Sequence, residues 1–579
     1  MKKKSLILLI VGIILLVLTI LLILFAVIYN NKSITLKDKY NKVDIKVSSK
    51  EEKIVKLNLD KKSNIIIEDI YLSNVNNNYI YILKGENNKN ISTGILLNKE
   101  GAILRNIDKG KYKLYISNNN SKKQKVRFNI KREDIKNEEV AILEQGSFIN
   151  EKILEFAGKD HQGWENTTIK KIKIADKMKD KYKDDNHLVS DMGSKEAIYL
   201  WVDDDTVYFY SKYKIAFGEY ANSAFANLES LIDINDLKYF DFSNVKYMWN
   251  FFMGDSSLSD IKAISYIDTS NVIEAGGMFS YCHSLSDITP VISFANAKLV
   301  GLDKMFYDTP VSDISIMKYF DVSEIEKFGG MFYATKVEDI SSLKDWNTEN
   351  ATDISFMFSG TRIKNVDALS KWNVSKVSDM TALFSQCGYL ESIDGLKNWD
   401  TSSLKSINYA FTYNAVKNLD ALKNFKTDNL TDISEAFSNM RDLENINGIK
   451  DWNVSKVSNF NLLFELTGIK DTKALEKWDV SNALNMNGMF NHTKIESLEG
   501  LKNWDVSNVT DFGDMFDNTQ VANLNDISKW DVSNGEKFDS MFANCKKLKD
   551  STGIDSWNVK GSKEAMFYKT ETKLPKWYS

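Results

Sequence analysis

The chain has 579 residues, which is too long for one compact domain, so several structural units are expected. Its formal net charge of −4 at pH 7, with 75 Lys and Arg interspersed among 79 Asp and Glu, argues against the basic surface that nucleic-acid binding requires. We therefore expect no nucleic-acid partner, and the many charged side chains are interpreted as solvated surface.

The N-terminus carries a membrane signal. A basic tip, residues 1–5, precedes an uncharged apolar run from Leu6 to Ile28. A helix of this length, at about 1.5 Å per residue, crosses a hydrocarbon core about 30 Å thick, which predicts a transmembrane signal-anchor helix over residues 6–29. The basic tip predicts a single-pass protein of the cell membrane, with its N-terminus cytoplasmic and its C-terminal bulk extracellular. A cleaved signal peptide is the alternative, although no small-x-small cleavage site precedes Tyr29.

Two segments are expected between this helix and the repeats described below. Residues 33–134 are predicted to form an extracellular β-sandwich-like module, because β-rich alternating runs such as Lys53 to Leu59 are separated by Asn-rich turns. Residues 135–224 are predicted to hold a linker and an N-terminal cap. In that segment a charged stretch around residues 172–183 is predicted to be helical, and the alternating run from Ile198 to Tyr210 predicts a hairpin with an acidic turn.

A Phe recurs every 25 to 27 residues over more than half of the chain. These residues are Phe225, Phe252, Phe279, Phe306, Phe332, Phe358, Phe384, Phe411, Phe437, Phe464, Phe490, Phe516, Phe542 and Phe567. A bulky residue, most often Trp, lies twelve residues before each Phe from Phe252 to Phe542, and we call it the anchor. Such a period is typical of a solenoid, which predicts about 13 coils over residues 225–567 and a short C-terminal cap over residues 568–579.

The spacing within one repeat suggests a strand followed by a helical turn. Leu501, Trp504 and Val506 match the L-x-x-L-x-L spacing of a leucine-rich-repeat strand, and the apolar residues from Val509 to Phe516 recur at helical spacing. The predicted fold class is therefore an α/β solenoid of the leucine-rich-repeat type, with a parallel sheet and short helices. It is preceded by a small all-β domain and one N-terminal transmembrane helix.

One segment carries a family resemblance. Trp-Asp-Val-Ser-Asn-Val-Thr-Asp-Phe-Gly-Asp-Met-Phe, residues 504–516, resembles the repeat of bacterial BspA-like leucine-rich-repeat surface proteins, as does the Cys-x-x-Leu form after Phe. The resemblance covers about residues 200–567. It implies cell-surface attachment and adhesion to host or matrix proteins or to other cells, and it supplies no catalytic residues. The chain departs from the pattern at Ile267 and Phe294, which replace Trp.

The candidate ligand-binding residues lie beside the anchors. The residue after the anchor is predicted to point outward, because strand side chains alternate. These positions are Asp241, Asp268, Asp321, Asn347, Asn373, Asp400, Asn453, Asp479, Asp505 and Asp531, and the residue before three early anchors adds Tyr239, Tyr266 and Tyr319. The alternative is structural: Asp and Asn close turns with the backbone two residues on, and the tyrosines pack against the cap.

Other polar residues suggest no chemistry. Cys282, Cys387 and Cys545 each lie three residues after a repeat Phe, in coils too far apart for a disulfide or a shared metal, so buried free thiols are predicted. The acidic run Asp203 to Asp205 lacks the spaced ligands and Gly of a calcium loop. The histidines form no catalytic or metal-binding motif. We expect no catalytic residue, no metal, no cofactor and no disulfide.

The leading functional hypothesis is an adhesin-like role without catalysis. A membrane-anchored bacterial cell-surface protein would bind an extracellular protein or glycan, from a host, a matrix or a neighbouring cell, through its repeat surface. One alternative is a structural protein of the cell envelope. A less favoured alternative is a surface enzyme with its chemistry in the N-terminal module, where no nucleophile–base signature occurs.

Overall fold

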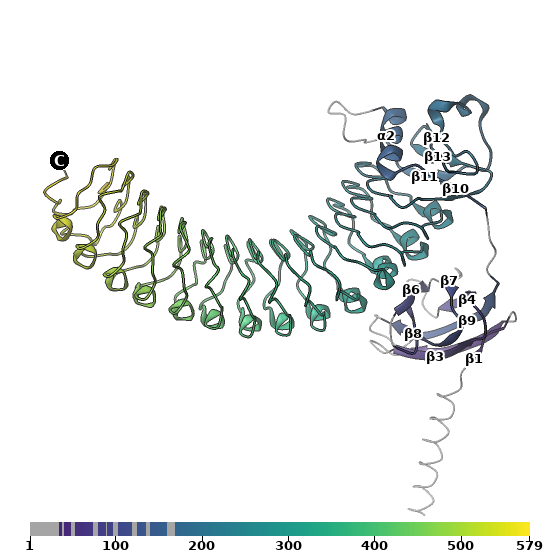
Figure 1. The fold of residues 1–579 in the computed structure, drawn as a ribbon, viewed down its shortest axis with the longest axis horizontal. Helices are drawn as coiled ribbons and strands as arrows, with labels where there is room; N and C mark the ends of the chain where they lie inside the picture. The colour runs from purple at the N-terminus through teal and green to yellow at the C-terminus, as the bar shows by residue number, and fades with distance from the viewer. Residues whose placement is uncertain are drawn as a thin grey trace, which may run out of the picture. The chain divides into compact units, whose positions relative to one another are not determined.

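The computed structural model describes residues 34–37, 40–47, 52–72, 79–87, 90–96, 102–118, 124–134, 139–158 and 168–578. They divide into two compact units (Figure 1). The first contains the described residues up to Glu139 together with two short segments, 264–268 and 290–296. The second contains the remaining residues from Val140 onward.

The first unit is built on two β-sheets that share one core. One sheet has the order β1-β3-β8-β5-β6, with β1 Ile34–Thr35, β3 Glu52–Leu59, β5 Tyr79–Lys84, β6 Asn90–Leu96 and β8 Gly110–Asn118. The other has the order β2-β9-β4-β7, with β2 Asn41–Val47, β4 Ser63–Leu72, β7 Ala102–Ile107 and β9 Gln124–Glu133. Strand side chains alternate between faces, so Leu57 and Leu59 of β3 and Phe128 and Ile130 of β9 all belong to one buried core.

The second unit begins with a small mixed segment. β10 Val140–Ile142 pairs in parallel with β14 Lys214–Ala216, and a three-stranded sheet has the order β11-β13-β12, with β11 Lys171–Ile174, β12 Tyr199–Asp203 and β13 Thr206–Tyr210. The helix α2 Gly146–Ala157 and the 3-10 turns η1 Asp180–Tyr182 and η2 Asp185–His187 complete it. The predicted hairpin is confirmed as β12 and β13, which pair antiparallel around the acidic turn. The predicted helix around residues 172–183 is wrong, because its start is the paired strand β11.

This segment covers the open end of the first repeat. The ring of Phe209, on β13, lies 5.4 Å from the ring of Phe240 between centroids. The backbone N–H of Phe217 donates to the carbonyl of Asp241 over 2.9 Å, and Asp241 donates to Ile215 over 2.9 Å. Backbone groups that the first repeat would otherwise expose are thus paired, as a terminal repeat requires.

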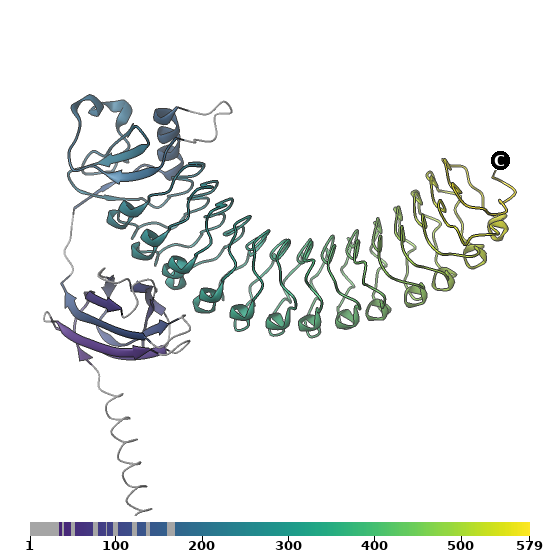
Figure 2. The ribbon, with the colours of Figure 1, turned by 180° about the vertical axis from the view of Figure 1, so that it is seen from behind.

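Each described repeat contains one 3-10 turn, which ends before the large apolar residue of that repeat except in η5, where the anchor Phe294 lies within the turn. Figures 1 and 2 show these turns aligned along one side of the successive repeats. They are η3 Asn235–Tyr239, η4 Lys262–Tyr266, η5 Thr289–Asn296, η6 Ser315–Tyr319, η7 Ser341–Leu343, η8 Asp367–Leu369, η9 Asp394–Leu396, η10 Asp420–Leu422, η11 Asn447–Ile449, η12 Lys473–Leu475, η13 Glu499–Leu501, η14 Asn525–Ile527 and η15 Thr552–Ile554.

Neighbouring repeats are joined by backbone hydrogen bonds without forming strands. A row of single parallel bridges links the residues five before each Phe, from Tyr220 and Tyr247 to Lys537 and Ser562. On either side of each Phe, the residues two before and two after have positive φ; around Phe516 these are Asp514 at 53° and Asn518 at 55°. Left-handed residues interrupt both extended strands and right-handed helices.

The predicted leucine-rich-repeat α/β solenoid, with a parallel sheet and short helices, is therefore wrong. The helix expected from Val509 to Phe516 is broken at Asp514 by its positive φ. Regular strands lie outside the described repeats, mostly in small antiparallel sheets, and the repeats themselves hold isolated bridges and lone 3-10 turns.

The predicted membrane location also needs correction. The residues of the expected anchor, 6–29, lie outside the described part of the chain. Within that part, no helix is long and apolar enough to cross a bilayer; its α-helix, α2, has 12 residues, whereas a span needs about 20. This finding contradicts the predicted single-pass protein of the cell membrane, and we withdraw that prediction.

Stacked aromatic rings form the core of the repeats. The recurring Phe rings stack on one another from Phe252 to Phe567, for example 6.1 Å apart between Phe279 and Phe306 and 5.6 Å apart between Phe516 and Phe542. Tryptophans form a second column: nine described tryptophans, seven of them anchors and the others Trp557 and Trp577, donate their indole N–H to a carbonyl of the preceding repeat. The Phe and Trp columns thus hold the repeats in register.

Candidate ligand-binding groove

Most of the predicted Asp and Asn residues close a turn after the anchor. Each accepts a hydrogen bond of 2.9 to 3.2 Å from the backbone N–H two residues on, in Asp241, Asp321, Asn347, Asn373, Asp400, Asn453, Asp479, Asp505 and Asp531. The remaining one, Asp268, is half-buried. This geometry is the turn-forming role of Asp and Asn, so their oxygens are partly used by the fold itself.

Neighbouring basic and hydroxyl groups also compensate the negative charge of some of these Asp residues. The Lys426 ammonium donates to Asp400 over 2.9 Å and, with the hydroxyl of Ser402, lowers the pKa of that carboxyl. Burial alone would raise the pKa of Asp241, but hydrogen bonds from Ser243 and the ion pair with Lys214, 3.2 Å long, lower it. These partners offset the repulsion that stacked carboxylates would otherwise feel.

The three predicted tyrosines lie at the ends of separate 3-10 turns. Tyr239 ends η3, Tyr266 ends η4 and Tyr319 ends η6. Tyr239 is exposed, with the Lys238 ammonium 5.3 Å from its ring centre, whereas Tyr266 and Tyr319 are half-buried. None of the three lies in the groove described below.

The three cysteines are buried free thiols. Their sulfurs donate to the carbonyl of a repeat Phe in the preceding repeat, as from Cys387 to Phe358 over 3.0 Å. In other repeats Thr takes this position, and the Thr467 hydroxyl donates to Phe464 over 2.8 Å. Burial raises the pKa of Cys387 and of Cys545 to about 11, so these thiols stay protonated at neutral pH.

The acidic hairpin turn is paired with lysines. Asp203 accepts a hydrogen bond from Lys179, and Asp205 pairs with Lys171 over 3.5 Å. No group of three or more His, Cys, Asp or Glu that could hold a metal ion occurs among the described residues.

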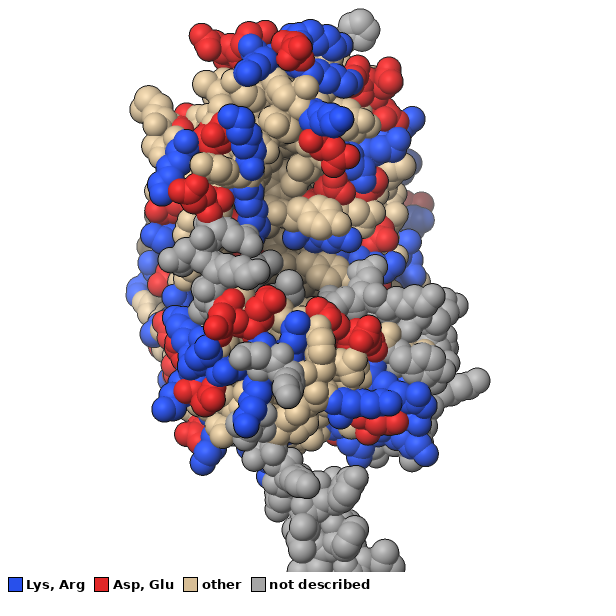
Figure 3. Space-filling model, turned by 90° about the vertical axis from the view of Figure 1, so that its right-hand side faces the viewer, with Lys and Arg blue, Asp and Glu red and all other residues tan. Residues whose placement is uncertain are grey.

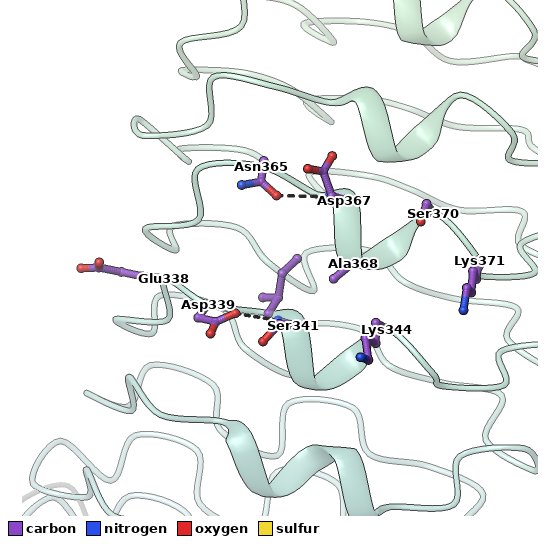
Figure 4. Close-up of a pocket in the computed structure, with 10 residues that line it drawn as sticks. Glu338, Asp339, Ser341, Lys344, Asn365, Asp367, Ala368, Ser370 and Lys371 are labelled. Carbon is purple, nitrogen blue, oxygen red and sulfur yellow. Dashed lines mark hydrogen bonds between the residues drawn. The ribbon is translucent and has the colours of Figure 1, made fainter. Parts of the chain in front are cut away.

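A hollow of about 370 Å³ separates η7 from η8 (Figure 4). Its polar side chains already form hydrogen bonds within the protein. Asp339 accepts from the backbone N–H of Ser341 over 2.8 Å, and Asn365 accepts from the backbone N–H of Asp367 over 3.3 Å. The same turn precedes most other 3-10 turns, for instance between Asp471 and Lys473. This hollow is therefore a general feature of the repeat rather than a distinct site.

A larger groove of about 700 Å³ crosses five successive repeats. We call it the aromatic groove; its lining residues come from the stretches 249–253, 277–281, 303–307, 327–330 and 353–356. All lie between five residues before and two residues after a repeat Phe. Because this part of each repeat is stacked on its neighbours by backbone hydrogen bonds, the groove is held by a continuous scaffold.

The groove exists because two repeats lack side chains there. The pairs Gly276–Gly277 and Gly329–Gly330 flank the repeat that carries Asp303 and Lys304. A Cβ at Gly276 would lie 3.0 Å from the indole nitrogen of Trp249, so a side chain there would crowd the ring. Thr, Asn or Ser occupies the position of Gly329 in the following repeats, at Ser355, Thr381, Asn408, Ser434, Asn461 and Asn487.

Aromatic rings run along the groove. Tyr281 and Tyr307 are 5.4 Å apart between centroids, Tyr307 and Tyr333 are stacked at 4.2 Å, and Tyr333 meets Phe356 edge-on at 6.3 Å. Phe356 at one end of the groove is 41% exposed, and Trp249 at the other end is 40% exposed. Burial, with the neighbouring Tyr333 and Tyr281, raises the pKa of Tyr307, so its hydroxyl stays neutral at pH 7 and can donate or accept a hydrogen bond.

Asp303 lies in the middle of the groove. Burial raises the pKa of its carboxyl, while a hydrogen bond from its own backbone N–H and the charges of Lys327 and Lys304 act in the opposite direction. Within the described part of the chain, no other residue donates a hydrogen bond to this carboxylate. A half-buried carboxylate without such a donor is a ready acceptor for a ligand.

The sequence analysis did not predict this groove, because it sought ligand-binding residues directly beside the anchor rather than around the repeat Phe. The signal was present: when the repeats are aligned on Phe, two Gly-Gly pairs bracket one Asp-Lys pair. The distribution of charge gave no indication either, because Lys and Arg are interspersed with Asp and Glu along the sequence. Figure 3 shows the same mixture of charges on one face of the molecule.

The comparisons with known proteins concern the repeats. The family model described as Mycoplasma protein of unknown function, DUF285, matches residues 220–340, 334–417, 389–495 and 466–577, which together span more than half of the chain. No curated protein matches the chain. The repeat character predicted from the Phe period is thus confirmed, and the chain belongs to the DUF285 family of Mycoplasma proteins of unknown function.

Proposed function

We propose that the repeats are a non-catalytic binding scaffold with an adhesin-like role, and that the aromatic groove holds the ligand, a protein or a glycan of a host, a matrix or a neighbouring cell. The groove carries this proposal. It presents exposed rings and polar groups in one hollow, the combination that binding sites favour.

The composition of the groove supports binding rather than catalysis. Its described lining residues include Ser280 and Ser355 but neither His nor Cys, so neither serine has an imidazole base among the residues that line the groove. The three thiols of the chain are buried elsewhere and hydrogen-bonded to backbone carbonyls.

The resemblance of residues 504–516 to BspA-like surface proteins supports the adhesin-like part of the proposal. That family is associated with attachment to host, matrix or cell surfaces. The match to DUF285 supports a repeat array, without naming a ligand.

Binding of the full chain to immobilised matrix proteins and to intact host cells tests the proposal. Wild type should bind at least one of these surfaces, and Gly329→Asn should weaken that binding by filling the groove floor. Gly513→Asn is the matched control, because Gly513 has the same place in a repeat outside the groove, where an added Cβ would meet the end of the Asn487 side chain at 2.7 Å rather than backbone. Equal binding by Gly329→Asn and wild type, or no binding by wild type, would contradict the proposal.

A further inference from the structure

The aromatic groove also indicates which class of ligand fits it. We infer that it binds a neutral, linear oligosaccharide; this inference rests on the proposed binding function and specifies its ligand. The length of the groove, its rings, its charges and its backbone hydrogen bonds favour such a ligand.

The rings are arranged for a long, flat-sided ligand. Trp249 and Phe356 are four repeat intervals apart, which at about 4.8 Å per interval is roughly 19 Å. Tyr281 and Tyr307 lie in the repeats between them. Pyranose rings present apolar C–H faces that stack on aromatic rings, so successive sugars can be met by successive repeats.

The charges of the groove favour a ligand without net charge. Asp303 and Asp353 are accompanied by Lys304 and Lys327, so an anionic or a cationic ligand would meet like charge somewhere along the groove. Hydroxyl groups suit this mixture, because each can donate to a carboxylate and accept from an ammonium. The half-buried Asp303 carboxylate in particular receives a hydrogen bond from its own backbone N–H and can accept a further one, which a sugar hydroxyl would supply.

The backbone of the groove disfavours an extended peptide. Peptides that add to a sheet use free backbone N–H and C=O groups. Here those groups already join the repeats: Gly277 donates to Asp303 over 2.8 Å, Lys304 to Gly329 over 2.8 Å, and Gly330 to Ser355 over 2.8 Å. The floor therefore offers little main-chain pairing, and recognition rests on rings and polar side chains.

Isothermal titration of the full chain with cellotetraose, maltotetraose and chitotetraose tests this inference. At least one should bind, and Trp249→Ala, Phe356→Ala and Gly329→Asn should each weaken it by about tenfold or more. Tyr409→Ala is the matched control for Phe356→Ala, because Tyr409 is an exposed ring at the same place in a repeat outside the groove. Gly513→Asn is the matched control for Gly329→Asn, and both control variants should bind the sugar as tightly as wild type does.

Two results would overturn the inference. One is that none of the three sugars binds; the other is that a sugar binds equally well to wild type and to all three groove variants. A separate arm distinguishes this failure from failure of the proposed function. If Gly329→Asn abolishes binding to a matrix protein that has been enzymatically deglycosylated, the groove binds protein, and only the oligosaccharide inference fails.

Discussion

The indole nitrogen of Trp372 donates a hydrogen bond to the backbone carbonyl of Leu343, 3.0 Å away and one repeat earlier. The same carbonyl accepts the backbone N–H of Trp346 over 3.1 Å, where the turn η7 ends. Each such Trp therefore satisfies the end of the 3-10 turn in the repeat before it. This contact gives the anchor a role that apolar burial alone would not require.

Loss of one indole donor should weaken the stack. Trp478 is buried, and its indole N–H donates to the carbonyl of Ile449 over 3.0 Å. Trp478→Phe keeps a ring, as Phe425 does at the equivalent position, but removes the donor and should reduce the free energy of unfolding by about 1 kcal/mol. Urea unfolding followed by circular dichroism measures this change. Tyr413→Phe, at an exposed ring, should leave the midpoint nearly unchanged, and an unaltered midpoint in Trp478→Phe would refute the role of the donor.

Relief of a left-handed residue should stabilise a repeat. Ala334 has a φ of 55°, and the equivalent residue of the next repeat is Gly360 with a φ of 72°. Ala334→Gly should therefore raise the thermal unfolding midpoint, through a gain of about 1 kcal/mol. Ala368, in η8, has an ordinary helical backbone, so Ala368→Gly should lower the midpoint by a loss of about 0.5–1 kcal/mol. Changes of the same sign in the two variants would contradict this account.

The buried Asp255 should make stability fall as pH rises. Burial raises the pKa of its carboxyl well above the ordinary value, and one of its oxygens has no hydrogen-bond partner. Below about pH 4 the carboxyl is protonated in both the folded and the unfolded chain. Above that pH the unfolded chain ionises while the folded chain keeps its proton, so wild type loses up to about 1.4 kcal/mol per pH unit until the folded group ionises.

Asp255→Asn should remove this dependence. Unfolding free energies of the variant and of wild type should agree near pH 4 and diverge in favour of the variant toward pH 7. Asn414 occupies the equivalent buried position in a later repeat, so Asn414→Asp should produce the opposite divergence. Parallel pH profiles of Asp255→Asn and wild type would show that burial of the carboxyl carries no penalty.

The native thiols should resist alkylation. Cys387 and Cys545 are fully buried, and burial raises the pKa of each to about 11, so very little thiolate forms at pH 8. Iodoacetamide should label the folded chain slowly and label all three cysteines after denaturation, as mass spectrometry would show. Ser402→Cys adds a thiol at an exposed position and should react rapidly in the folded chain. Fast labelling of Cys387 under native conditions would indicate that its repeat opens.

Around Phe516 the hydrophobic pattern predicts burial correctly and backbone conformation incorrectly. The sequence placed Phe512, Met515 and Phe516 on one buried face, and all three are buried. It assigned them to a helix because they recur at helical spacing, yet Asp514 between them has a φ of 53°. Asp tolerates this conformation better than most residues, but Leu462 and Phe356 adopt it at the same position in other repeats. No local preference explains those residues, so the neighbouring repeats impose the conformation.

The candidate site also has a part that the sequence predicts and a part that only the structure reveals. The turn-forming alternative for Asp505 could be stated from the sequence, and its carboxylate accepts from Ser507 over 3.1 Å. The aromatic groove could not be located in this way, because Trp249 and Phe356 are more than a hundred residues apart in the chain. Only stacking of the repeats brings them to the ends of one hollow.

The sequence by itself determined the period of the repeats, the burial of the Phe and Trp residues that recur at fixed spacing, and the hairpin that covers the first repeat. Hydrophobic spacing and alternation are local properties, so they can be read without a structure. The tertiary structure decided the backbone conformation between Trp and Phe and the position of the groove. Both depend on hydrogen bonds and missing side chains in neighbouring repeats, and such contacts override the preference of any single segment.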